Sequence, residues 1–153
     1  MMMKTKTTGF TLVEVLVTVV ILSLGLLGLA GLQLSSLRDN TSAEQRGKAA
    51  QLVYDMVDRM RTSRDNNNLI LLNAYTNPAA QDASCKTMVG CNRTALAGHD
   101  RFEWEREIAD SLPLGTGDVS IAGTVFTVKV MWDDNRDGVV DASDAVFSAS
   151  FEP

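Results

Sequence analysis

The sequence predicts a ladle-shaped α+β fold, in which a long N-terminal helix with a protruding apolar half packs on a small antiparallel sheet. Two patterns predict this fold. Apolar residues recur at helical spacing over residues 10–64, and apolar and polar residues alternate after residue 118 as they do in strands. With 153 residues, the chain has room for one domain and an appendage.

The helix begins with the apolar segment at residues 9–34, GFTLVEVLVTVVILSLGLLGLAGLQL. A bilayer core requires roughly 20 such residues. Lys4 and Lys6 precede the segment, and positive charge there keeps that end cytoplasmic. Glu14 is the only charge inside it, and a charge costs on the order of 3 kcal/mol at the bilayer centre, so we expect a partner to compensate it. The alternative is that Glu14 lies at headgroup depth, partly solvated and without a partner.

The helix continues over residues 35–64 as an amphipathic half. Its apolar stripe should lie on the sheet, and it comprises Leu34, Leu37, Thr41, Ala49, Leu52, Val53, Met56, Val57 and Met60. Asp65 and the three asparagines after it favour an end to the helix, because their side chains compete for backbone hydrogen bonds.

Composition argues against two classes of function. The net charge of −5 does not suit a nucleic-acid protein, which presents a basic face. His99 is the only histidine, no phosphate-binding glycine motif is present, and no nucleophile has a recognisable base beside it. We therefore expect no enzyme, and we interpret His99 as a polar loop residue.

The two cysteines, Cys85 and Cys91, enclose five residues. In an oxidising compartment such a pair predicts a disulfide. A metal site would need the usual two-residue spacing or a nearby histidine. Free thiols are the other alternative.

The head, residues 65–153, should contain one short helix and three strands. Asp100 as N-cap with Glu103 three residues later predicts a helix at residues 100–111 that buries Trp104 and Ile108. A hairpin at residues 119–132 should turn at residues 122–123 and bury alternate side chains of its second strand, and residues 145–151 should form the last strand.

An acidic loop connects the last two strands. Its residues match the spacing of a calcium loop, with Asp133, Asn135, Asp137, Val139, Asp141 and Asp144 as candidate ligands. The last position holds Asp rather than the longer Glu, and the flanks are strands rather than helices. The alternative is a solvated hairpin loop built on Asp137-Gly138.

The leader and the apolar segment carry a family resemblance. A basic leader ending at Gly9, then Phe10, Glu14 and an apolar run, resembles type IV pilins and the pseudopilins of type II secretion. Residues 26–33 and the segments at 96–104 and 112–115 resemble the PilV family of minor pilins more narrowly. This resemblance implies a pilin fold.

The resemblance also implies how the N-terminus is processed and used. Prepilin peptidase would cut between Gly9 and Phe10, the new amine of Phe10 would be N-methylated, and Glu14 would pair with that amine on a neighbouring subunit. The domains are then a leader at 1–9, a transmembrane and polymerisation half at 10–34, the amphipathic half at 35–64 and the head. A secretory signal cut near Ala30 is the alternative.

The implied location is the inner membrane, crossed once with a periplasmic head, and then the pilus. The implied partners are other minor pilins, the major pilin and a tip-associated adhesin. A pseudopilin of type II secretion is the alternative within the class. A membrane-anchored calcium-binding module that never polymerises is the alternative from another class.

Overall fold

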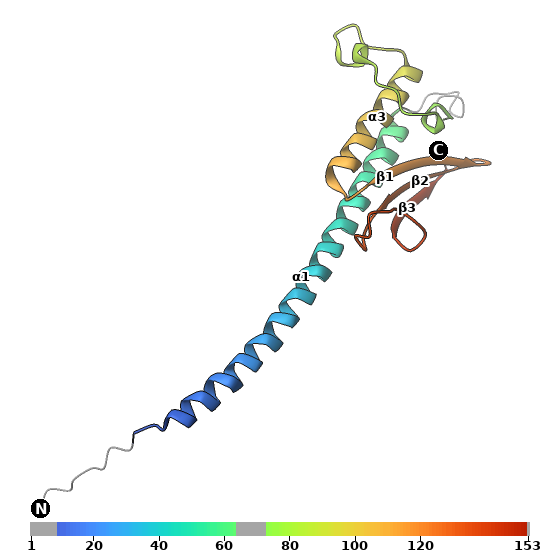
Figure 1. The fold of residues 1–153 in the computed structure, drawn as a ribbon. Helices are drawn as coiled ribbons and strands as arrows, with labels where there is room; N and C mark the ends of the chain where they lie inside the picture. The colour runs from blue at the N-terminus through green and yellow to red at the C-terminus, as the bar shows by residue number, and fades with distance from the viewer. Residues whose placement is uncertain (1–8, 64–72, 153) are drawn as a thin grey trace, which may run out of the picture. The chain divides into compact units, whose positions relative to one another are not determined.

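The computed structural model describes residues 9–63 and 73–152 (Figure 1). The chain divides into two compact units, residues 1–41 and 42–153. Along the chain the described elements are α1 (Leu12–Thr62), the 3-10 helices η1 (Ala74–Thr76) and η2 (Ala83–Lys86), α3 (Arg93–Ser111), β1 (Thr116–Ala122), β2 (Val125–Trp132) and β3 (Ala145–Phe151). The predicted α+β class is confirmed.

α1 is one uninterrupted helix of 51 residues, as the apolar periodicity predicts. Its buried positions all lie in the second unit and match the predicted stripe: Ala49, Leu52, Val53, Met56, Val57 and Met60. Leu34 and Leu37, which we placed on the same stripe, are exposed. The predicted stop at residues 65–68 lies outside the described residues.

The sheet is antiparallel with the order β1-β2-β3. Val128 at its centre pairs with Val119 of β1 and Ala149 of β3. The prediction of β3 is confirmed, but β1 begins at Thr116, earlier than predicted. The turn is Gly123-Thr124 rather than Ala122-Gly123, because Gly123 supplies the positive φ of 65° that a tight turn needs.

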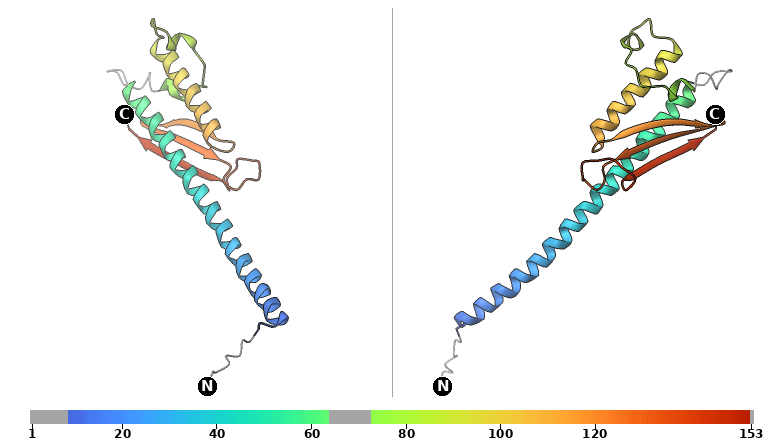
Figure 2. Two further views of the ribbon diagram at one scale, coloured as in Figure 1. Left: turned by 90° about the vertical axis from the view of Figure 1, so that its left-hand side faces the viewer. Right: turned by 45° about the vertical axis from the view of Figure 1, so that its right-hand side comes forward.

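Figure 2 shows α3 beside the second half of α1, with both helices on one face of the sheet. The core between these layers takes alternate residues of β2, and Phe126, Val128, Val130 and Trp132 are buried as predicted. Trp104 of α3 packs there and donates a hydrogen bond of 2.8 Å from Nε1 to the carbonyl oxygen of Leu52. This bond fixes α3 against α1.

The prediction for α3 was wrong at its start. The helix begins at Arg93, and Asn92 is the N-cap, with its side-chain oxygen accepting the N–H of Ala95 at 2.8 Å. Asp100 is therefore inside the helix and does not cap it. His99 lies in the same helix and is buried, so its interpretation as a polar loop residue was also wrong.

Candidate functional site

The predicted cleavage position lies just before the start of α1. Gly9 and Phe10 precede the helix, and the Phe10 side chain is exposed. Thr11 is placed as the N-cap, since its hydroxyl accepts the N–H of Glu14 at 3.3 Å. The sequence carries a signal for this cap, a threonine followed by glutamate three residues later, which our sequence analysis did not use.

Glu14 lies in the first turn of α1, where the helix dipole favours a negative charge. Its backbone oxygen accepts a hydrogen bond of 2.6 Å from the Thr18 hydroxyl. Within the described part of the chain, its carboxylate makes neither a hydrogen bond nor an ion pair. The compensating partner predicted for this carboxylate is therefore not supplied by the described residues of its own chain.

The first unit presents an apolar surface along α1. Over its most apolar window the helix has a mean hydropathy of 2.6, and none of that window is buried. By length and composition it is the one helix of the described residues that could cross a membrane. The positions of Gly25, Gly28 and Gly31 leave open space where a side chain would be. This surface fits membrane anchoring or burial against other helices.

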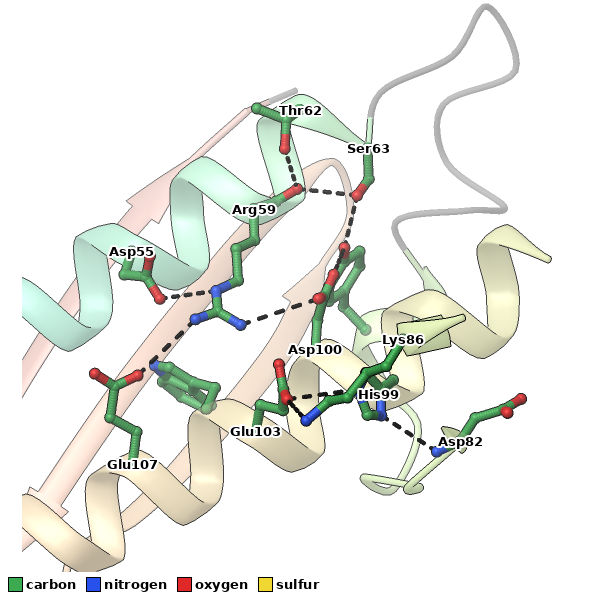
Figure 3. Close-up of polar contacts among 12 residues, drawn as sticks. Asp55, Arg59, Thr62, Ser63, Asp82, Lys86, His99, Asp100, Glu103 and Glu107 are labelled. Atoms are coloured by element: carbon green, nitrogen blue, oxygen red, sulfur yellow. Dashed lines mark hydrogen bonds and ion pairs between the residues drawn. The ribbon is translucent and has the colours of Figure 1, made fainter. Parts of the chain in front are cut away.

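The second unit contains a polar cluster where α1 meets α3 (Figure 3). Arg59 of α1 lies 2.8 Å from the carboxylate of Asp55, 3.9 Å from that of Asp100 and 3.9 Å from that of Glu107. Three carboxylates from two helices thus surround one guanidinium. Ion pairs at the surface each contribute at most about 1 kcal/mol, so this cluster orients the helices more than it stabilises them.

Tyr75 of η1 extends this cluster. Its hydroxyl donates to Asp100 at 2.9 Å and lies 2.7 Å from the hydroxyl of Ser63. Burial raises the pKa of Tyr75 above its usual value, so the phenol stays protonated. Arg101 is buried beside it and donates to the carbonyl oxygen of Tyr75 at 2.8 Å. These bonds position η1 and the segment that follows it.

The disulfide loop, residues 82–92, comes next along the chain. The structure joins Cys85 to Cys91, which supports the predicted disulfide. At the tip of the loop Met88 and Val89 are fully exposed. The backbone N–H of Asp82 donates to the side chain of His99 in α3, and the ammonium of Lys86 pairs with the carboxylate of Glu103 in the same helix (Figure 3).

The acidic loop between β2 and β3 is held by its own carboxylates. Asp133 is buried and accepts backbone N–H groups from Arg136, Asp137 and Gly138. Gly138 has a φ of +87°, which suits the Asp-Gly turn of our alternative interpretation. A hydrogen bond from the Ser143 hydroxyl lowers the pKa of Asp141.

The structure does not gather the candidate calcium ligands as a metal site. Among the described residues, no three side chains of His, Cys, Asp or Glu come together in a way that could hold a metal ion. Asn135 donates to Asp137 at 3.1 Å, and Asp144 accepts the N–H of Asp141 at 2.8 Å. Val139 donates its N–H to Asp137 at 2.9 Å. The calcium site stays a prediction.

Two family models match this chain. Residues 4–30 match the prokaryotic N-terminal methylation motif, and residues 31–102 match the family described as type IV pilin Tt1218. The comparisons with curated proteins and with solved structures each found no match. The two matches support a pilin whose N-terminus carries a methylation motif. The narrower resemblance to PilV stays a prediction.

Proposed function

We propose that this chain is a minor type IV pilin, which helps to initiate pilus assembly and is incorporated into the pilus. The observation that carries the proposal is the methylation motif at residues 4–30, which covers the start of α1 and most of its apolar half. The match of residues 31–102 to a type IV pilin family supports the same class from an independent part of the chain.

Processing makes the N-terminal segment competent for assembly. Prepilin peptidase cuts between Gly9 and Phe10 and leaves an amine on Phe10, which is then methylated. Glu14 lies four residues further on and has no partner for its carboxylate within the described part of the chain. Pairing with the Phe10 amine of a neighbouring subunit offsets the cost of each buried charge and sets the axial register.

The partners of this subunit are other minor pilins, the major pilin and a tip-associated adhesin. Before assembly the subunit is held in the inner membrane by its apolar half, and its head faces the periplasm. In the pilus the apolar half packs among the helices of these partners. The head then displays the disulfide loop and the acidic loop. A type II secretion pseudopilin would use the same N-terminal chemistry, and genomic neighbours distinguish the two systems.

The first test is the N-terminus of the protein isolated from its own cell envelope, determined by mass spectrometry. We expect a chain that begins at Phe10 and carries one methyl group. A mature chain that still contains Lys4 and Lys6 would contradict processing and leave a static membrane anchor. A chain cut near Ala30 would identify an ordinary secretory signal instead.

The second test replaces Glu14 with glutamine, which removes the charge and keeps the shape. We expect normal processing but at least about tenfold less incorporation into sheared pili, the factor that corresponds to 1.4 kcal/mol. Glu44→Gln is the matched control, since Glu44 is exposed on the same helix outside the apolar segment. Equal incorporation of both variants would refute the pairing of Glu14.

A further inference from the structure

His99 is the only histidine of the chain, and its side chain is 5% exposed. It lies in α3 beside the disulfide loop, residues 82–92. Figure 3 shows its ring between Asp82 of the loop and Glu103, one turn further along α3. Neither the assembly of the apolar helix nor the polar cluster around Arg59 requires a histidine here.

The ring contacts the loop through Nδ1. This nitrogen accepts a hydrogen bond of 3.2 Å from the backbone N–H of Asp82, the N-cap of η2. An imidazole nitrogen accepts a hydrogen bond only when it carries no proton, so the contact requires a neutral ring with its proton on Nε2. Nε2 is buried, makes no hydrogen bond within the described part of the chain and lies 3.5 Å from Oε1 of Glu103.

A second contact holds the same loop. The ammonium of Lys86, next to Cys85, lies 2.5 Å from Oε1 of Glu103. The loop is therefore attached to α3 by two side-chain contacts, and both depend on the state of His99. One uses its Nδ1 directly, and the other uses the carboxylate oxygen nearest its Nε2.

From this geometry we propose that His99 controls the attachment of the disulfide loop by its protonation: neutral His99 holds the loop against α3, and protonated His99 releases it. A proton on Nδ1 turns that nitrogen into a donor that points at the N–H of Asp82, so the hydrogen bond is lost. The new positive charge on the ring also attracts Glu103 and competes with Lys86 for the same oxygen.

The surrounding charges come from the loop and from both helices. The charged groups around the ring are the carboxylates of Asp82 and Glu103 and the ammonium of Lys86, and Arg59 of α1 acts on the same Glu103 carboxylate. Histidine is the side chain that ordinarily changes charge between about pH 5 and pH 8. Hydrogen bonds from the hydroxyl and the backbone N–H of Ser84 lower the pKa of Asp82, and one from Lys86 lowers the pKa of Glu103. Both carboxylates therefore remain charged between about pH 5 and pH 8. A change in loop opening within this pH range is then assigned to His99.

Release changes what the head presents. Met88 and Val89 form the fully exposed apolar tip of the loop, and the disulfide keeps the loop closed after it detaches. The backbone bond from Ala80 N–H to the carbonyl oxygen of Gly98, 3.0 Å long, is independent of His99 and keeps the preceding segment in place. Acid therefore frees the tip without unfolding the head.

Hydrogen–deuterium exchange of the full-length protein in detergent micelles tests this proposal. We expect the amides of residues 82–91 to open about fivefold more often at about pH 5 than at about pH 8, after correction for intrinsic exchange rates. This factor corresponds to the loss of one hydrogen bond of ordinary net strength. The amides of β2 should not change. Equal opening of the loop at both pH values would overturn the proposal.

Two variants make the test specific. In His99→Asn the side-chain oxygen accepts the N–H of Asp82 but does not titrate, so loop opening should become independent of pH. Asp110→Asn is the control, because the pair between Arg106 and Asp110 is exposed near the other end of α3. It should keep the full response to pH. A pH response that persists in His99→Asn would overturn the proposal.

A measurement on the unmodified protein covers the case in which His99→Asn does not fold. Nuclear magnetic resonance follows the ring nitrogens of His99 and the backbone amide of Asp82 through one pH titration. We expect both to change with the same midpoint, because the proton on the ring breaks the bond to that amide. An Asp82 amide that does not change while His99 titrates would overturn the proposal.

Discussion

The two halves of α1 differ in what covers their apolar side chains, although they form one continuous helix. Leu24 in the first unit is 66% exposed, whereas Leu52 in the second is 6% exposed. The second half is stabilised by packing against the sheet and α3. The first half has no such packing within its own unit, and long apolar surfaces are not stable in water. This apolar surface fits membrane anchoring or packing against other helices.

The same substitution in each half tests this difference most strongly. Leu52→Ala should lower the free energy of unfolding of the head by about 2–5 kcal/mol, because it leaves a cavity in the core. Leu24→Ala should change it by less than about 0.5 kcal/mol, since Leu24 is exposed and belongs to the other unit. Both tryptophans of the chain are in the head, so denaturant unfolding followed by tryptophan fluorescence reports the head alone. Comparable losses in the two variants would contradict the division of α1.

Two glycines of the second unit, Gly117 and Gly47, test its packing with smaller expected effects. At Gly117 of β1 an added Cβ would lie 2.3 Å from Cζ3 of Trp104, so Gly117→Ala must displace the indole that binds the carbonyl oxygen of Leu52. We expect a loss of about 1–3 kcal/mol from overpacking. Thermal unfolding followed by near-ultraviolet circular dichroism measures it.

Gly47 is the matched control, since it lies in α1 with open space where a side chain would be. Gly47→Ala should raise stability by up to about 1 kcal/mol, because alanine favours a helix more than glycine does. The two variants should therefore differ in sign. A Gly117→Ala protein as stable as the wild type would show that Trp104 does not pack tightly on β1.

The elements that sequence predicts well are those with a long, regular pattern. Helical spacing identifies α1 over its whole length, and strict alternation identifies β2 together with its buried face. In β2 and in the second half of α1 these signals are strong because one face is buried and the other is not. The first half of α1 is recognised instead by its continuous apolar run, none of which is buried. The start of α3 was missed because Asn92 caps the helix alone, without an acidic residue three positions later, while Asp100 and Glu103 have the spacing of a cap inside the helix.

The functional sites could be predicted from the sequence only where a local motif marks their residues. The processing motif is local in sequence, so Gly9, Phe10 and Glu14 could be proposed from residue order alone. The environment of His99 depends on contacts between α3 and the disulfide loop just before it, and no sequence motif marks how the loop folds back onto the helix. Burial of a lone histidine could be inferred only after the helix was known to begin at Arg93.

A calcium ion in the acidic loop would make the stability of the head depend on a component that is not part of the chain. If the loop binds calcium, millimolar calcium should raise the melting temperature, and binding at ten times the dissociation constant corresponds to about 1.4 kcal/mol. The effect should be no larger, because Asp133 must give up backbone hydrogen bonds for the ion to bind.

Thermal unfolding with calcium, with magnesium and with a chelator measures this effect. Asp144→Asn should abolish the shift, whereas Asp118→Asn on β1 should retain it, since Asp118 is distant in sequence from the loop. If calcium leaves the melting temperature unchanged, the loop does not bind calcium, and the alternative of a solvated hairpin loop built on the Asp-Gly turn holds. The head would then hold its fold with its own residues alone, and the requirement for an outside partner would be confined to the apolar half of α1.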